Sequence, residues 1–135
     1  MSEQQFRAWL DLYAEAFEAE DADAAAHLFT PDATYQWGPF GALLRGPEEI
    51  RARWAAALDR TGHATCDFEI LAVTEQLSIA RWLASYTYPA EQRRVRYDGV
   101  FAVHLTPAGL CSDFREWWNT REDILVPGVD DDGSD

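Results

Sequence analysis

Hydrophobic residues recur every three or four positions near the start of the chain. This period predicts an amphipathic helix over residues 3–19, with an apolar stripe made of Phe6, Trp9, Leu10, Tyr13 and Phe17. The acidic run 20–23 supplies N-cap candidates for a short second helix that reaches Phe29, and Pro31 ends it. The chain is therefore expected to begin with two helices.

A short strand and a third helix are expected next. Residues 33–37 read as a strand, and the loop after them contains two glycines and a proline. The sequence Gly46-Pro47-Glu48-Glu49 is typical of a helix start, because proline is favoured at the first helical position and acids in the first turn. Thr61-Gly62 ends this helix.

From residue 65 onward the hydrophobic period changes to two. Four segments alternate in this way and are predicted to be strands joined by short turns, which favour an antiparallel meander: 65–74, 77–88, 95–105 and 110–121. Helices first and a long sheet afterwards predict an α+β fold. In it, three N-terminal helices pack on one face of a curved, mainly antiparallel sheet.

Size, composition and charge narrow the possible functions. The chain has 135 residues, 47% of them hydrophobic, which predicts one domain over residues 1–126 and an acidic, disordered tail at 127–135. The net charge of -13 would repel phosphate groups, so neither nucleic acid nor an anionic membrane is an expected partner. No stretch approaches the ~20 apolar residues of a membrane span.

Motifs for metals and cofactors do not appear in the sequence. The three histidines and two cysteines show no metal-ligand spacing, and there is no glycine-rich phosphate loop. Cys66 and Cys111 are far apart and indicate reduced thiols, and the first residues lack the pattern of a signal peptide. The sequence predicts a cytoplasmic protein without a metal or other cofactor.

The most informative stretch is 109–123. Alternation places Phe114, Glu116 and Trp118 on one face of the last predicted strand and Trp117 on the other. A carboxylate between two large aromatic residues is unfavourable to bury in its ionised form unless it has a partner or a function. Glu116 is therefore the leading candidate for chemistry at the wall of a cavity.

Arg81 is the predicted partner of Glu116. It stands between Ile79 and Leu83 on one face of an earlier strand, in surroundings as apolar as those of Glu116. If both side chains point inward, a charge-assisted hydrogen bond satisfies both. Two interpretations remain open: Glu116 is a general base or water activator that Arg81 orients, or the two form a structural ion pair.

Four segments give the chain a family resemblance. They are 29–35, 45–50, 98–101 and 114–118, with the sequences Phe-Thr-Pro-Asp-Ala-Thr-Tyr, Arg-Gly-Pro-Glu-Glu-Ile, Asp-Gly-Val-Phe and Phe-Arg-Glu-Trp-Trp. They resemble the nuclear transport factor 2-like superfamily, which includes SnoaL-like domains, ketosteroid isomerases and limonene epoxide hydrolases. The resemblance implies a cone-shaped fold with an internal pocket. It implies no single reaction, because this fold hosts enzymes, binding proteins and assembly modules.

The catalytic residues of these relatives match only in part. Tyr13 corresponds to the tyrosine that donates a hydrogen bond to the oxyanion in ketosteroid isomerases, whereas Trp37 and Phe101 replace their two acids. Glu116 and Arg81 correspond to the water-activating aspartate and the arginine of limonene epoxide hydrolases, whose second aspartate falls on a leucine here. In SnoaL-like cyclases an acid on a late strand is the general base, a role that the resemblance gives to Glu116.

Aromatic residues are expected both around the pocket and on the outer face of the sheet. The predicted ligand-binding residues are Tyr35, Trp37, Phe40, Phe114, Trp118 and, at the rim, His63. Aromatic residues at such positions are either core packing or ligand walls. Trp82, Tyr86, Tyr88 and Trp117 are expected on the outer face. Because the fold relatives commonly pair sheets back to back, they predict a homodimer.

The sequence leads to two hypotheses. In the first, the protein binds a small, apolar or weakly polar organic molecule and catalyses cofactor-independent acid–base chemistry of isomerase, cyclase, dehydratase or hydrolase type. Glu116 would be the base, Arg81 its orienter and Tyr13 a hydrogen-bond donor. In the second, the protein is a non-catalytic ligand-binding or dimerisation module with a structural Glu116–Arg81 pair.

Overall fold

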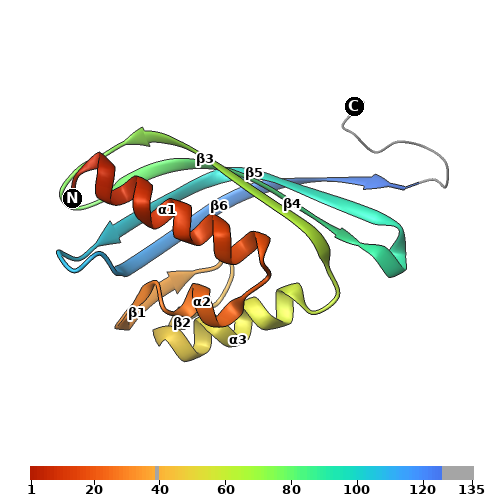
Figure 1. Ribbon diagram of the computed structural model, residues 1–135, viewed down its shortest axis with the longest axis horizontal. Helices are drawn as coiled ribbons and strands as arrows, with labels where there is room; N and C mark the ends of the chain where they lie inside the picture. Colours follow the sequence, from red (N-terminus) through yellow and green to blue (C-terminus); the bar gives the residue numbers. More distant parts are fainter. Residues whose placement is uncertain (39, 126–135) are drawn as a thin grey trace.

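A curved sheet and three helices on its concave side make up the structure, a computed structural model that describes residues 1–38 and 40–125 (Figure 1). The elements in chain order are α1 (Glu3–Glu18), α2 (Ala22–Ala26), β1 (Phe29–Gln36), β2 (Leu43–Arg45), α3 (Gly46–Leu58), β3 (Gly62–Ala72), β4 (Ser78–Tyr88), a 3-10 turn (Pro89–Glu91), β5 (Arg93–Leu105) and β6 (Cys111–Ile124). The predicted α+β class is confirmed. The predicted tail lies outside the described residues.

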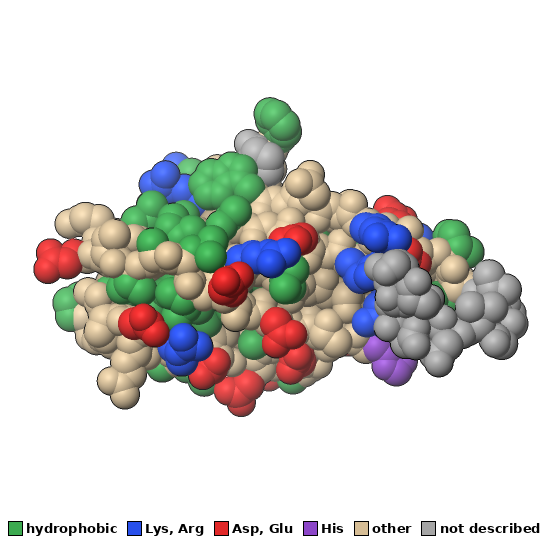
Figure 2. All heavy atoms as spheres, turned by 90° about the horizontal axis from the view of Figure 1, so that it is seen from above, with side chains coloured by type: hydrophobic (Ala, Val, Ile, Leu, Met, Phe, Trp, Pro, Cys, Tyr) green, Lys and Arg blue, Asp and Glu red, His purple; other side chains and the backbone are tan. Residues whose placement is uncertain are grey.

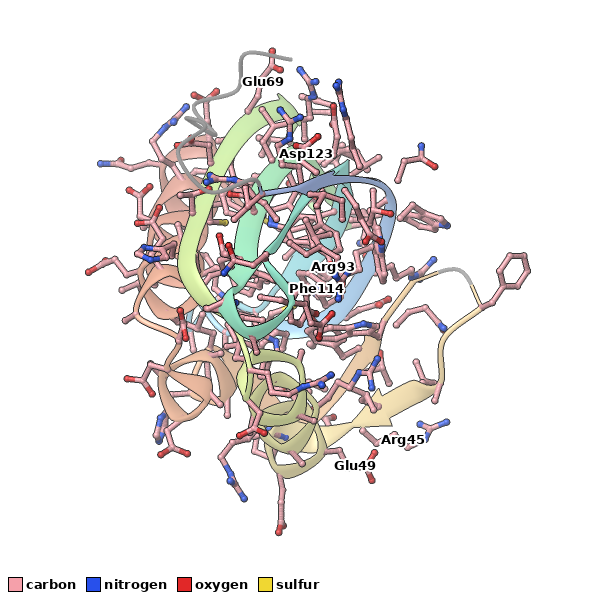
Figure 3. All side chains as sticks on the ribbon, turned by 90° about the vertical axis from the view of Figure 1, so that its right-hand side faces the viewer. Arg45, Glu49, Glu69, Arg93, Phe114 and Asp123 are labelled. Carbon is pink, nitrogen blue, oxygen red and sulfur yellow. The ribbon has the colours of Figure 1, made fainter. Side chains whose placement is uncertain are left out.

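The helices begin where capping groups are available. The Ser2 hydroxyl accepts a hydrogen bond from the backbone of Gln5, whose side chain bonds back to Ser2, so α1 starts with a capping box. At the start of α3 the Glu49 carboxylate accepts a 2.8 Å hydrogen bond from the Arg45 backbone N–H (Figure 3). The second helix is shorter than predicted, because Phe29 already belongs to β1.

The sheet has six strands in the order β2-β1-β6-β5-β4-β3. β3 to β6 form the predicted antiparallel meander, while β1 pairs with β6 in parallel. The short strand β2 was not predicted, because three residues beside a glycine-rich loop carry no readable period. The helices cover the concave face, and Phe114 lies in the interior between the two layers (Figure 3).

Strand register decides which side chains share a face. Glu116 stands opposite Phe101, which stands opposite Ala80, and all three are buried on the concave face. The next positions, Trp117 and Arg81, lie on the convex face, with Val100 of β5 between them. Arg81 is therefore on the opposite side of the sheet from Glu116, and the predicted Glu116–Arg81 pair is wrong. The reason is the alternation of β4, which turns Ala80 and Trp82 inward and Arg81 outward.

The same alternation corrects the predicted outer aromatic face. Trp82 and Tyr86 are buried on the concave side, and the half-buried Tyr88 shares that face. Trp117 is on the convex face as predicted, with 44% of its surface exposed. The larger apolar side chains on the convex face of β4 and β6 are therefore Leu83 and Trp117, and not the three aromatic residues of β4. The homodimer stays a prediction.

Paired charges dominate the convex face. The Arg81 guanidinium donates two hydrogen bonds to the Asp98 carboxylate, at 3.0 and 2.7 Å. Arg96 Nη2 donates one hydrogen bond of 2.8 Å to the Asp123 carboxylate across β5 and β6. Figure 2 shows acidic and basic side chains interspersed on this side of the molecule, and hydrophobic side chains gathered toward the end where β3 turns into β4. Exposed ion pairs like these add little to stability, because water already solvates both charges.

Candidate functional site

A cavity of about 340 Å³ lies between the concave face of the sheet and the helices α1 and α3. Side chains from α1, the end of β1, α3, β4, β5 and β6 form its wall. Its aromatic residues are Tyr13, Phe17, Trp37, Trp54, Trp82, Tyr86, Tyr88, Tyr97 and Trp118. A mostly apolar wall with a few polar groups is the usual composition of a small-molecule site.

Glu116 is the acid in this wall. The residue is 2% exposed, and its Oε1 accepts a hydrogen bond from the Tyr35 hydroxyl at 3.4 Å. That hydroxyl in turn accepts a bond of 3.3 Å from Trp54 Nε1. A relay from α3 through β1 therefore orients one oxygen of the carboxyl group.

The other oxygen, Oε2, is buried and has no hydrogen-bond partner among the described residues. An unsatisfied buried oxygen destabilises a fold by roughly 1–3 kcal/mol, so such atoms call for an explanation. Since Glu116 lines the cavity, a molecule bound there can supply the missing partner.

Burial raises the pKa of Glu116 from its ordinary value of 4.5 to about 8. The hydrogen bond from Tyr35 and the positive charge of Arg53 act in the opposite direction but do not outweigh burial. Glu116 is therefore mostly protonated at neutral pH. A carboxylic acid in this state can donate a proton or a hydrogen bond to a ligand oxygen.

Two tyrosines beside Glu116 are neutral hydrogen-bond donors. Burial, reinforced by the proximity of Glu116, raises the pKa of both Tyr13 and Tyr35 well above the usual value of 10.0. Tyr13 lines the cavity and packs edge-on against Trp54 and Phe101, at 5.0 and 5.1 Å between ring centroids. The surrounding rings thus hold Tyr13 rigidly beside the cavity.

A second polar spot in the wall is a pair of hydrogen-bonded tyrosine hydroxyls, those of Tyr86 and Tyr97. Burial is the main cause that raises the pKa of both groups, so both stay neutral. Besides the tyrosines, the ionisable side chains of the wall are Glu116 and Arg53. Arg53 lies with its guanidinium carbon 4.9 Å from the centre of the Trp37 ring. Carboxyl, hydroxyl and guanidinium groups therefore face a mainly aromatic space.

The structure brings together four of the nine predicted site residues at the cavity: Glu116, Tyr13, Trp37 and Trp118. Tyr35 is directly behind Glu116 and touches it, and Phe114 is completely buried against Tyr35, with 4.4 Å between ring centroids. These two support the wall from the core.

The other three predicted residues do not line the cavity either. Arg81 faces outward, as its pairing with Asp98 shows. Phe40 is fully exposed in the loop after β1, so it is no ligand wall in this structure. His63 stands at the beginning of β3 with a positive φ of 53° and is not part of the wall.

Sequence reasoning missed most of the aromatic wall. Trp82, Tyr86 and Tyr88 were expected on the outer face, and Arg53, Trp54 and Tyr97 were not assigned to the site. A signal was present in β4, where one face carries alanine and aromatic residues and the other carries Arg81, Leu83, Ser85 and Thr87. The more apolar of two faces is the one that packs on the helices.

Neither a metal-binding cluster nor a membrane span is found in the described part of the chain. In residues 1–38 and 40–125, no three His, Cys, Asp or Glu side chains lie together as metal ligands would. No helix in these ranges is both long and apolar enough to cross a bilayer. The polar groups available to a bound molecule in the cavity are thus the carboxyl, hydroxyl, indole and guanidinium groups of the wall.

Comparison with known proteins gives a family and a set of similar folds. The family model described as SnoaL-like domain matches residues 9–113, most of the chain. None of the curated proteins matches this sequence.

Three solved structures illustrate the similarity of fold. RV0760c from Mycobacterium tuberculosis has a TM-score of 0.76 and 16% identity, with 91% of this chain and 99% of that chain covered. The epoxide hydrolase/cyclase-like enzyme SalBIII, which has a role in pyran ring formation in the polyether salinomycin, has a TM-score of 0.75 and 20% identity. The match covers 87% of this chain and 93% of that chain. A computationally designed 17-OHP binder has a TM-score of 0.74 and 17% identity, with 88% of this chain and 98% of that chain covered. Such identities show the fold alone.

Proposed function

The chain belongs to the SnoaL-like domain family, and we propose that it binds a small, largely apolar organic molecule in the cavity and catalyses an acid–base reaction on it. The observation that carries this proposal is Glu116. A buried carboxyl group with one oriented oxygen, one unpartnered oxygen and a pKa near neutrality is a functional-site candidate. Its place in an aromatic cavity supplies the space for a substrate.

Glu116 is best suited to begin as a general acid. Protonated at neutral pH, it donates its proton to a carbonyl, ether or epoxide oxygen of the substrate, and the carboxylate that results takes a proton back as a general base. Tyr35 holds Oε1, while the hydroxyl of Tyr13 can donate a hydrogen bond to a negatively charged oxygen. This set suits isomerisation, cyclisation, dehydration or water addition, and needs no cofactor.

Probe reactions can test this chemistry without the natural substrate. Suitable probes are an aryl epoxide, whose hydrolysis is followed, and a bicyclic ketone, whose exchange of α-hydrogen for solvent deuterium is followed by NMR. Glu116→Gln should lower the faster of these reactions by about 10²–10⁴-fold, the usual contribution of a general acid or base. Asp98→Asn, the same change on the convex face, should leave it unaltered.

The pH dependence of the probe reaction rates is a second test of the role of Glu116. Because the acid form of Glu116 is lost above its pKa of about 8, the rate of the acid-dependent step should decline as the pH rises through that value. Equal conversion of every probe by the wild type and Glu116→Gln would contradict the catalytic proposal.

Ligand binding without catalysis is the second candidate function. The similar fold of a computationally designed 17-OHP binder and the outward position of Arg81, which removes the predicted orienter of a water activator, favour this alternative. Glu116 and Tyr13 would then serve only as hydrogen-bond partners of the ligand. In that case the wild type binds the probes without converting them, and Glu116→Gln weakens binding by about tenfold, the scale of one hydrogen bond to a buried group.

A further inference from the structure

Arg53 is the positively charged side chain of the cavity wall. It projects from the exposed side of α3, so its guanidinium group lies where the cavity meets solvent, and it rests on the face of Trp37. A cation–π contact of this kind fixes the position of the guanidinium group without using its hydrogen-bond donors.

No ion pair in residues 1–38 and 40–125 includes Arg53. Arg51, two positions earlier on the same helix, lies 3.7 Å from the Asp23 carboxylate. Without a carboxylate partner in these residues, Arg53 keeps its guanidinium donors available to a bound molecule.

The charge of Arg53 reaches into the cavity, since it is one of the influences that hold down the pKa of Glu116. With Glu116 protonated at neutral pH, the wall carries one positive charge and no negative charge. Such a space attracts an anion, whereas the surface of the protein as a whole repels one.

We infer that the molecule bound in the cavity is an organic carboxylate: its apolar, ring-containing body lies among the aromatic side chains and its carboxylate pairs with Arg53 at the mouth. The planar guanidinium group presents two parallel donors that match a carboxylate. The volume of about 340 Å³ is near the lower end of small-molecule sites, which suits a body of one to three rings. This inference rests on the proposed function and adds the class of substrate to it.

The test compares acids with their neutral amides. Isothermal titration calorimetry would measure benzoate, 2-naphthoate and anthracene-2-carboxylate, each beside its primary amide, against the wild type, Arg53→Gln, Arg53→Lys and the matched control Arg51→Gln. We expect at least one acid to bind about tenfold or more tightly than its amide at low salt. This preference should vanish in Arg53→Gln, persist in part in Arg53→Lys and remain unchanged in Arg51→Gln.

An acid that binds no more tightly than its amide in all three pairs, or that keeps its preference in Arg53→Gln, overturns the inference, as does the absence of acid binding altogether. The proposed function fails separately. If acids bind through Arg53 but Glu116→Gln converts the probes as fast as the wild type, the catalytic proposal falls and this inference stands. Thermal melting curves of the wild type and the Arg53 variants should coincide, because Arg53 is exposed. Coinciding curves would show that a loss of binding is not caused by a loss of folding.

Discussion

The two faces of the sheet are built from the same strands but hold acidic side chains in opposite environments. On the convex face, Arg81 and Asp98 are half exposed and satisfy each other through two hydrogen bonds. On the concave face, one position away on β6 from the exposed Trp117, Glu116 is buried with one oxygen unpartnered. The chain thus keeps this ion pair in solvent, whereas Glu116, which has no cationic partner within 4 Å among the described residues, lies in the cavity.

This difference separates a stabilising feature from a functional one. An exposed ion pair adds little to stability, because water already solvates both groups. A buried, poorly satisfied carboxyl group destabilises the fold, and a protein tolerates such a group where it serves a purpose. The contrast between the faces is therefore a better pointer to function than the number of charged residues.

The largest expected effect comes from removing core volume on the concave face alone. Phe101 is completely buried, and its ring is 5.1 Å from that of Tyr13 and 4.5 Å from that of Phe114. Phe101→Ala should lower the free energy of unfolding by about 3–5 kcal/mol through the cavity it leaves. Val100→Ala, one position away on the convex face, should lower it by less than about 1 kcal/mol. Urea denaturation checks both, and similar losses would mean that the faces are not distinct.

The next effect is a pH dependence that belongs to Glu116. Between its ordinary pKa of 4.5, which applies to the unfolded chain, and about 8 in the fold, the folded state binds more protons. The free energy of unfolding therefore falls as the pH rises through this interval. Glu116→Gln removes this pH dependence. Near pH 9 the free energy of unfolding of the variant should therefore be about 2–4 kcal/mol higher than that of the wild type. This is less than the full pKa shift implies, because water can enter the cavity and solvate the carboxylate.

Urea denaturation of the wild type and Glu116→Gln at roughly pH 5 and pH 9 measures this difference. Near pH 5 the two proteins should be of similar stability, since Glu116 is protonated in the folded state. Parallel stability curves across this range would show that Glu116 is not a buried acid with a raised pKa.

The smallest effect is expected from the convex pair. The hydrogen bonds from Arg81 lower the pKa of Asp98, so the stability they provide is present above the ordinary value of 3.8 and is lost as the pH falls below it. A double-mutant cycle with Arg81→Gln and Asp98→Asn should give a coupling of at most about 1 kcal/mol, which decreases in ~1 M salt. A coupling several times larger would place this pair among the main stabilising interactions.

Much of the fold could be predicted because its signals are local. The stripe of α1, the Gly46-Pro47 start of α3 and the period-two strands of the meander are all visible within short windows of sequence. The strand β2 was not predicted because its three residues are too few to show a period. The parallel pairing of β1 with β6 was not predicted because it joins segments about 80 residues apart in the chain.

The candidate site was less predictable. Glu116 was found because a carboxylate between aromatic residues is unusual within one strand, and the structure confirms its inward direction. Its partner was misassigned because the alternation of β4 admits two choices of inner face, and the choice of the Arg81 face reversed every residue of that strand. Arg53 carried no signal, since its position at the cavity depends on how α3 packs beside Trp37.

The sequence by itself determined the helices, the antiparallel meander, the acidic character and the inward carboxyl group of β6. Each follows from residue spacing or composition, which neighbours in the chain define. The tertiary structure decided which face of β4 meets the helices, which hydroxyl groups surround Glu116, and that one of its oxygens has no partner in the described residues. Those properties arise from contacts between distant segments, and it is these contacts, by excluding water, that raise the pKa of Glu116.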